Sequence, residues 1–124
     1  MPLRHENLIA WQRADDLFVA LHQLTFQRFP AHERFELSTQ LRRAAYSVAA
    51  NIVEGFGRRS PRDRAHFLNM AEASLAEVAY CLHVARRLGY LEQVDYERLD
   101  LEIQRTFAPL AGLLRATRAS DNRE

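Results

Sequence analysis

The sequence is poor in residues that break helices or form cross-links. Its 124 residues include one cysteine, four glycines and four prolines, and all 17 basic residues are arginines because lysine is absent. The single thiol, Cys81, cannot form an internal disulfide, which is typical of a reducing compartment. No apolar run approaches the ~20 residues that a transmembrane helix needs. We therefore expect a cytoplasmic protein that does not bind a membrane.

The few glycines and prolines divide the chain into four segments with helical periodicity. The spacing predicts helices near residues 8–29, 33–56, 61–88 and 93–117, with flexible ends at 1–6 and 118–124. Long helices joined by short connections pack as antiparallel neighbours. The predicted fold class for residues 1–124 is all-α, a single up-down-up-down antiparallel four-helix bundle.

The predicted core follows steps of three and four residues along each helix. In the third helix it comprises Leu68, Ala71, Leu75, Val78, Leu82 and Ala85, and in the fourth Tyr96, Leu99, Ile103, Phe107, Leu110 and Leu114. Ser60 is the expected N-cap of the third helix, since Pro61 after it suits the first helical position.

Two of the helices have a second apolar face that a single small bundle cannot cover. It comprises Trp11, Phe18, Phe26 and Phe29 in the first helix, and Met70, Ala73, Tyr80, Val84 and Leu88 in the third. Contiguous exposed apolar surface normally marks an interface, whereas solitary surface hydrophobes are common. These nine residues are predicted to form an oligomer interface, and scattered surface hydrophobes are the alternative.

Polar residues flank the apolar stripe of the second helix. They are Gln40, Ser47, Asn51 and Glu54, and Gly55 and Gly57 follow as a helix stop. Such residues either satisfy one another in a buried network or line a groove for a ligand, and Glu77 allows the same two interpretations. No predicted strand precedes the Gly-x-Gly, so a dinucleotide-binding loop is not expected.

No group of residues has the pattern of a catalytic or metal site. Di-iron bundles need paired Glu-x-x-His motifs, and the nearest match is one Asp63-x-x-His66. No Gly-x-Ser-x-Gly elbow surrounds a serine, and Cys81 lacks an electropositive setting. We expect no catalytic residue, metal or cofactor, and an enzyme is the least favoured class.

Charge is unevenly distributed, although the formal net charge is only +1. Residues 92–102 hold five acids against one arginine. Residues 42–64 hold two acids against six arginines, namely Arg42, Arg43, Arg58, Arg59, Arg62 and Arg64. The planar arginine fork suits phosphate, so these six are predicted to contact RNA or single-stranded DNA. Alternatively, they pair with the 92–102 acids within or between subunits.

Two blocks resemble the signature of a known family. Residues 37–55 (LSTQLRRAAYSVAANIVEG) and 67–78 (FLNMAEASLAEV) are similar to the hallmarks of four-helix-bundle proteins named for 23S ribosomal RNA intervening sequences. The resemblance extends over residues 8–114, and residues 88–91 also fit it. Ala49 and Ala73 depart from it, where the family often has proline and glycine. The family motif adds Ser74 to the polar set of Gln40, Ser47, Asn51, Glu54, Gly55 and Glu77.

The resemblance implies a bacterial, cytoplasmic, ring-like homopentamer. Accessory variability proteins of diversity-generating retroelements look similar, and they bind nucleic acid and partner with a reverse transcriptase. Members encoded inside ribosomal RNA genes have no settled biochemical role, so the family name describes a gene location. The predicted function is a non-enzymatic homo-oligomer that binds nucleic acid or serves as a scaffold. The alternative is an accessory subunit that contacts only protein.

Overall fold

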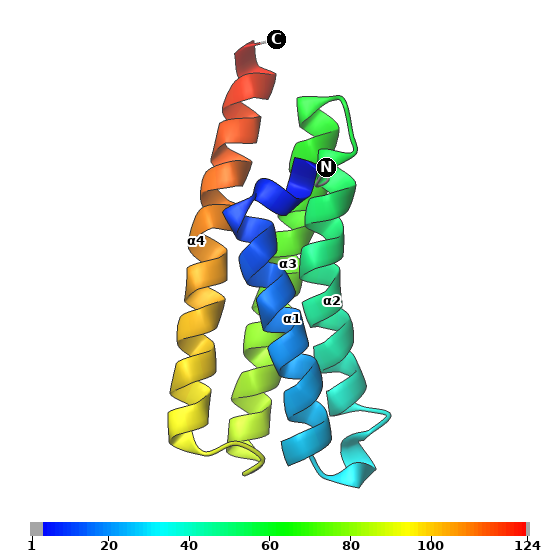
Figure 1. Ribbon diagram of the computed structural model, residues 1–124, viewed down its shortest axis with the longest axis vertical. Coiled ribbons are helices and arrows are strands. Elements are labelled where there is room, and N and C mark those ends of the chain that lie inside the picture. The colour runs from blue at the N-terminus through cyan, green and yellow to red at the C-terminus, as the bar shows by residue number, and fades with distance from the viewer. Residues whose placement is uncertain (1–3, 124) are drawn as a thin grey trace.

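Four long helices form the molecule, whose computed structural model describes residues 4–123 (Figure 1). They are α1 (Ile9–Arg28), α2 (Leu37–Phe56), α3 (Pro61–Arg87) and α4 (Gln93–Arg123). Each helix packs against the next, α4 returns to contact α1, and successive helices run in opposite directions (Figure 1). Residues 4–123 contain no strand. The predicted all-α, up-down-up-down four-helix bundle is confirmed.

The ends of α3 follow from local backbone chemistry. The Ser60 hydroxyl accepts a hydrogen bond from the Asp63 N–H at 3.4 Å, and Pro61 occupies the first helical position. Beyond the other end, Gly89 adopts φ +81°, a left-handed conformation that is cheapest for glycine. The Tyr90 N–H then bonds back to the Ala85 carbonyl at 2.9 Å. These two turns set the antiparallel packing of α2, α3 and α4.

Two predicted boundaries were wrong. The second helix begins at Leu37 instead of 33, because Ala31–Glu33 forms a separate 3₁₀ turn (η2) and the Leu37 N–H bonds to the Glu33 carboxylate at 3.2 Å. The fourth helix continues to Arg123 instead of ending at 117, since residues 118–123 contain neither glycine nor proline to stop it. At the other end, residues 4–7 form a 3₁₀ turn (η1), and residues 1–3 of the predicted flexible end lie outside the described residues.

The core contains the whole predicted seam of α3. In α4 the prediction fails at Phe107, which is 36% exposed, whereas Thr106 is 1% exposed. Thr106 can be buried because its hydroxyl donates to the Glu102 carbonyl at 2.9 Å and is thereby satisfied. None of the helices within residues 4–123 is long and apolar enough to cross a membrane.

Candidate nucleic-acid interface and assembly surface

The six predicted phosphate-binding arginines lie in two separate places. Arg42 and Arg43 are on the first half of α2, whereas Arg58, Arg59, Arg62 and Arg64 are in the α2–α3 turn and the first turn of α3. Arg42 and Arg58 are 16 residues apart, which corresponds to about 24 Å along a helix. The six arginines therefore do not form a single patch on one subunit, and their contact with nucleic acid stays a prediction. We call the four residues at the α2–α3 turn the basic end.

The basic end holds some of its guanidinium groups in place and leaves others free. Arg58 Nη2 lies 2.6 Å from Glu54 Oε1, and its guanidinium carbon is 4.8 Å from the Phe67 ring centre. Arg64 Nε donates to the Arg58 carbonyl at 2.8 Å. Arg59 and Arg62 are exposed and have no ion-pair partner within the described chain. The basic end thus offers at least two unpaired, solvated arginines.

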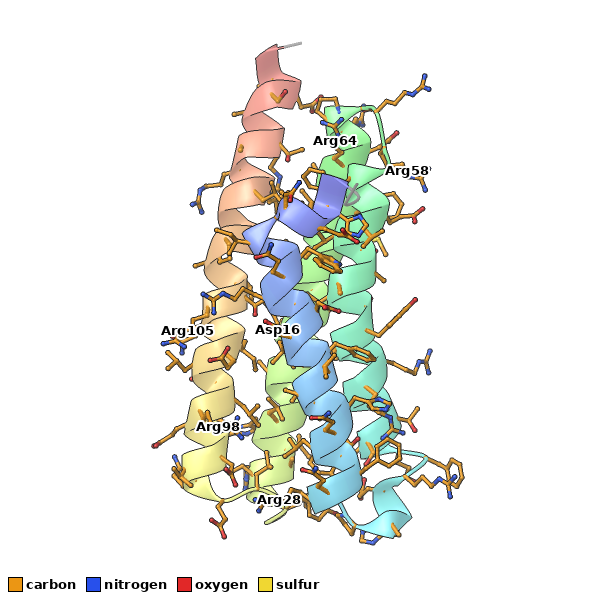
Figure 2. All side chains as sticks on the ribbon, in the orientation of Figure 1. Asp16, Arg28, Arg58, Arg64, Arg98 and Arg105 are labelled. Atoms are coloured by element: carbon orange, nitrogen blue, oxygen red, sulfur yellow. The ribbon has the colours of Figure 1, made fainter. Side chains whose placement is uncertain are left out.

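Within one subunit, the predicted alternative that the six arginines pair with the 92–102 acids is wrong. Asp95 lies 3.8 Å from both Arg28 and Arg98, and Glu102 lies 3.1 Å from Arg105. Figure 2 shows why: Arg58 and Arg64 lie at the end where α2 meets α3, whereas Arg28 and Arg98 lie toward the opposite end. The bundle length separates the basic end from these acids.

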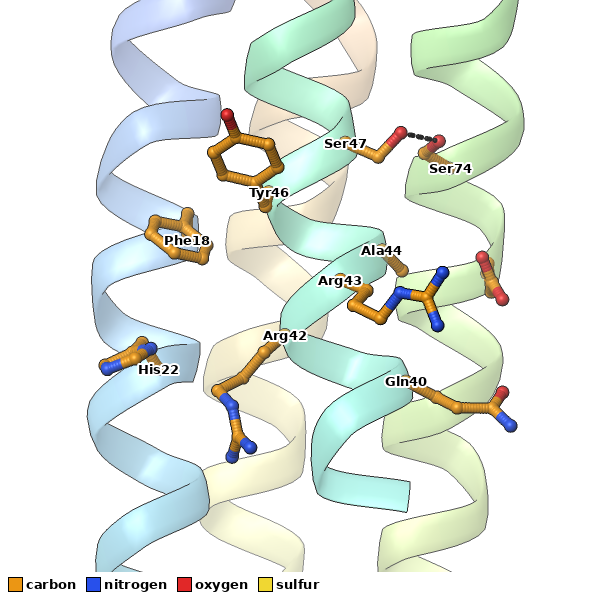
Figure 3. Close-up of a pocket in the computed structure, with 10 residues that line it drawn as sticks. Phe18, His22, Gln40, Arg42, Arg43, Ala44, Tyr46, Ser47 and Ser74 are labelled. Atoms are coloured by element: carbon orange, nitrogen blue, oxygen red, sulfur yellow. Dashed lines mark hydrogen bonds between the residues drawn. The ribbon is translucent and has the colours of Figure 1, made fainter. Parts of the chain in front are cut away.

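Arg42 and Arg43 are adjacent in sequence and line the same pocket, but their guanidinium groups point to different sides of α2 (Figure 3). Arg42 Nη1 donates to Thr25 Oγ1 at 2.9 Å, and its guanidinium lies 4.8 Å from the ring centre of Phe26, on the α1 side of α2. Arg43 points to the α3 side of α2 (Figure 3). Successive residues on a helix differ by about 100° in direction, which accounts for this divergence.

The predicted polar network forms only in part. Asn51 Nδ2 donates to the Ser47 carbonyl at 2.8 Å and to Ser47 Oγ at 2.9 Å, and Ser74 Oγ donates to Ser47 Oγ at 2.9 Å (Figure 3). Glu54 instead pairs with Arg58. The hydrogen bond between Ser74 and Ser47 ties α3 to α2.

The remaining predicted members have other settings. Gly55 is buried where α2 crosses α3, and a Cβ there would lie 3.3 Å from both Arg64 O and Phe67 Cβ. Gln40 and Glu77 line a groove between α2 and α3 that also contains Tyr80 and Cys81. Ser47 and Ser74 line a pocket together with Gln40 and Glu77, so the hydrogen-bonded pair borders the groove (Figure 3). That the groove receives a ligand stays a prediction.

Burial and a nearby charge change the acidity of Cys81. Its side chain is 4% exposed, and this burial raises the pKa of the thiol above its usual value. The negative charge of Glu77 raises the pKa further. Such a thiol stays protonated at neutral pH, which is the opposite of a catalytic cysteine.

The predicted oligomer interface is largely exposed on α3 and partly buried on α1. Along α3, the side chains of Met70, Ala73, Tyr80 and Leu88 are exposed and Val84 is half-buried. In α1, Trp11 and Phe18 pack against the core, whereas Phe26 is 66% exposed. Phe29 was wrongly predicted: it is 7% exposed and belongs to the core, where its ring lies 5.6 Å from that of Tyr90.

Exposed aromatics that the periodicity argument missed lie outside the two predicted faces. Phe35 is 82% exposed in the α1–α2 connection, and Tyr46 is exposed on α2, with its ring 5.8 Å from that of Phe18. An isolated aromatic in a connection has no period to identify it. In the described part of the chain, no three His, Cys, Asp or Glu residues are grouped as a metal site would require.

Comparison with known proteins places the chain in a family. A family model described as "23S rRNA-intervening sequence protein" matches residues 6–112. A crystal structure of a protein of unknown function from the S23 ribosomal protein family of Bacteroides thetaiotaomicron is similar, with a TM-score of 0.80 and 22% identity over 86% of this chain and 96% of that one. At that identity the likeness shows a shared fold. No curated protein matches. The chain belongs to the 23S rRNA-intervening sequence protein family.

Proposed function

We propose that this chain is a non-enzymatic scaffold that assembles with copies of itself through the outer face of α3 and binds RNA or single-stranded DNA through its basic end. The observation that carries the proposal is the grouping of Arg58, Arg59, Arg62 and Arg64 beyond reach of the 92–102 acids. Arginine forks bind phosphate oxygens in pairs, and two of these arginines are unpaired.

Self-association makes this modest patch useful. The formal net charge of one chain is only +1, so long-range attraction to nucleic acid is weak. Copies arranged in a ring, as the family resemblance suggests, would place several basic ends on one strand. Linked sites can bind far more tightly than one site without any new contact.

The assembly contact is proposed for one stripe of α3, the outer stripe, defined by its spacing of three and four residues. It comprises His66, Met70, Ala73, Glu77, Tyr80, Val84 and Leu88. This spacing is that of a helix seam, yet within residues 4–123 the stripe is exposed except at the half-buried Val84. A pentamer is the state that the family resemblance favours.

Nucleic-acid binding is tested by its salt dependence. Fluorescence anisotropy of a labelled single-stranded RNA, and of the DNA of the same sequence, should give a slope of log K against log salt of about −3 if four arginines contact phosphate. That slope corresponds to an affinity loss of about 50-fold between 50 and 200 mM salt. Absent or salt-independent binding would contradict this half of the proposal.

A matched variant locates the contact. Replacing Arg58, Arg59, Arg62 and Arg64 with Gln should remove most binding. A control with the same change in net charge replaces Arg28, Arg87, Arg98 and Arg105 with Gln, and it should bind nearly as the unmodified chain does. Equal losses in both would indicate general charge attraction instead of a site at the basic end.

A second candidate function is supported by the α2–α3 groove. Glu33, Glu36 and Glu77 line it together with the apolar side chains of Tyr80 and Leu88. Acids repel a phosphate backbone but attract a basic, amphipathic protein segment. An accessory subunit that binds only protein would use this groove, and a reverse transcriptase is the partner that the resemblance suggests. Co-purification of a reverse transcriptase with the variant in which Arg58, Arg59, Arg62 and Arg64 are replaced by Gln would favour this candidate.

A further inference from the structure

A pocket of about 260 Å³ lies at the opposite end of the bundle from the basic end. It is formed where α1 ends and α2 begins, and its polar and aromatic lining comprises Thr25, Phe26, Phe29, Arg34, Ser38 and Arg42. One water occupies ~30 Å³ of liquid, so the space admits a small polyatomic group.

The pocket contains two positive charges and no carboxylate. Neither Arg34 nor Arg42 has an ion-pair partner in residues 4–123. Glu33 and Glu36, the acids nearest in sequence to Arg34, line the neighbouring α2–α3 groove instead, where Glu33 accepts a hydrogen bond from the Leu37 N–H. Full guanidinium charges outweigh the roughly half charge that the last carbonyls of α1 contribute at this end. The pocket is therefore electropositive.

Arg42 is positioned before any ligand arrives, whereas the exposed Arg34 has its guanidinium 5.3 Å from the ring centre of Phe35. Arg42 is half-buried between Thr25 Oγ1, 2.9 Å away, and the ring of Phe26. An arginine has five N–H donors, and this contact uses one of them. The Thr39 hydroxyl donates to the Arg34 carbonyl at 2.6 Å and fixes the backbone that carries the second arginine. Preorganised donors lose less conformational entropy on binding.

Ser38 supplies an independent sign that a ligand is missing. It lines the pocket, its side chain is 1% exposed, and its hydroxyl has no hydrogen-bond partner in the described structure. Buried hydroxyls are nearly always satisfied, because desolvation without a partner costs free energy. Ser38 is also the second residue of α2, where the helix dipole favours an anion. The Leu37 N–H before it is already bonded to the Glu33 carboxylate at 3.2 Å.

We propose that this pocket binds a phosphate group, held by the guanidinium groups of Arg34 and Arg42 and the hydroxyl of Ser38. Phosphate offers several acceptor oxygens to a planar fork, to a hydroxyl and to the α2 N-terminus at once. The site is separate from the basic end and does not depend on nucleic-acid binding there. Its phosphate can come from a free nucleotide or from the end of a strand, and the test distinguishes these sources.

The test is calorimetric titration of the full chain in low-salt, phosphate-free buffer with AMP, adenosine, inorganic phosphate, and a trinucleotide with either a 5′-phosphate or a 5′-hydroxyl. Phosphate-bearing probes should bind saturably and the two phosphate-free probes should not. Tighter binding of AMP indicates a free nucleotide, tighter binding of the 5′-phosphorylated trinucleotide indicates a strand end, and equal binding of all three indicates the phosphate alone. Absence of saturable binding, or equal binding of adenosine, would overturn the proposal.

Neighbouring residues provide matched variants. Arg42→Gln should weaken phosphate binding at least ~10-fold, the loss typical of one good charge-assisted contact. Arg43→Gln, with the same charge change on the next residue, should leave it unaltered. Ser38→Ala should weaken binding while keeping or raising the melting temperature, because it removes an unsatisfied hydroxyl. Equal losses in the Arg42 and Arg43 variants, or unaltered binding in Ser38→Ala with a lowered melting temperature, would contradict the assignment.

Discussion

α3 carries two stripes with the same spacing and opposite surroundings. The inner stripe, Leu68, Ala71, Leu75, Val78, Leu82 and Ala85, is fully buried against the other helices. In the outer stripe, Met70 is 41%, Leu88 54% and Tyr80 66% exposed. Both stripes advance by three and four residues, as a helix seam does. Periodicity therefore predicts that a face of the helix will be covered. The composition of that face must indicate whether the same subunit or a partner covers it.

The compositions of the two stripes differ in a way that fits the core position of one and the proposed subunit contact of the other. The inner stripe contains only aliphatic residues, because water leaves it when the chain folds. The outer stripe mixes His66 and Glu77 with an aromatic and a methionine. Interfaces that form between folded proteins contain aromatic residues and methionine within a polar rim. We infer that the outer stripe is adapted to remain hydrated until a partner arrives.

The largest effect is expected from a substitution in the inner stripe. Leu75→Ala should lower the free energy of unfolding by about 3 kcal/mol, because it removes buried methyl groups and leaves a cavity. Tyr80→Ala, measured below the concentration at which the chain assembles, should change it by less than about 0.5 kcal/mol. Urea unfolding followed by circular dichroism makes the comparison. Equal losses would show that the outer stripe is part of the monomer core.

The second-largest effect is expected from a substitution in the outer stripe. Tyr80→Glu places a charge in the proposed subunit contact and should weaken association by about 2 kcal/mol or more, as loss of a central aromatic contact does. Light scattering should show the mass falling toward the 14.4 kDa of one chain while helical content is retained. Tyr46→Glu is the matched control, because Tyr46 is 62% exposed on α2 outside the stripe. Trp11 is unsuitable for this test, since it packs against the core.

Much of the fold was predictable, because helices need only local information. Gly89 and Ser60-Pro61 mark real helix ends, and each has a mechanism visible in the sequence. The errors arose where two local signals compete. Thr106 and Phe107 both suit a helix, and the inward position went to the threonine because its hydroxyl is satisfied by the backbone. The α2 start depended on the Glu33 carboxylate reaching the Leu37 N–H, which the apolar spacing does not encode.

Less of the candidate site was predictable, because it depends on which helices meet. The six arginines form one run in sequence, yet Arg42 and Arg58 lie at different ends of α2. Glu54 has the spacing of the polar network, but Arg58 one turn later is a closer partner. The proposed phosphate pocket was not predicted at all, since its lining residues come together only where the end of α1 meets the start of α2.

A smaller effect tests the edge between the two stripes. Ser74 lies at this edge and bonds to Ser47 of α2 at 2.9 Å. A double-mutant cycle with Ser47→Ala and Ser74→Ala should give a coupling energy of about 1 kcal/mol, the usual net value of one hydrogen bond. The control cycle pairs Ser47→Ala with Thr117→Ala, whose hydroxyl bonds only to the Leu113 carbonyl of its own helix. A coupling near zero in both cycles would mean that the α2–α3 bond contributes nothing.

The smallest effect concerns Cys81, which lies between the stripes and adjoins Glu77 in the groove. Burial, reinforced by the Glu77 charge, raises the pKa of the folded thiol above the ~8.5 of an exposed one. The unfolded chain therefore loses this proton first as pH rises. The stability that the thiol contributes is complete below about pH 8.5 and is lost as pH rises through the folded pKa.

The free energy of unfolding should consequently decline above about pH 8.5, less steeply in Glu77→Gln and least in Cys81→Ala. The chain has no lysine, and the pKa of Tyr90, which burial also raises, starts from about 10, so few other groups titrate in this range. Urea unfolding at half-unit steps from pH 7.5 to 10 measures the slope. An identical slope in Cys81→Ala would assign the decline to another group. A reduced slope in Glu77→Gln would show that the outer stripe acts electrostatically on a residue at the edge of the core, which links the two stripes through charge as well as through packing.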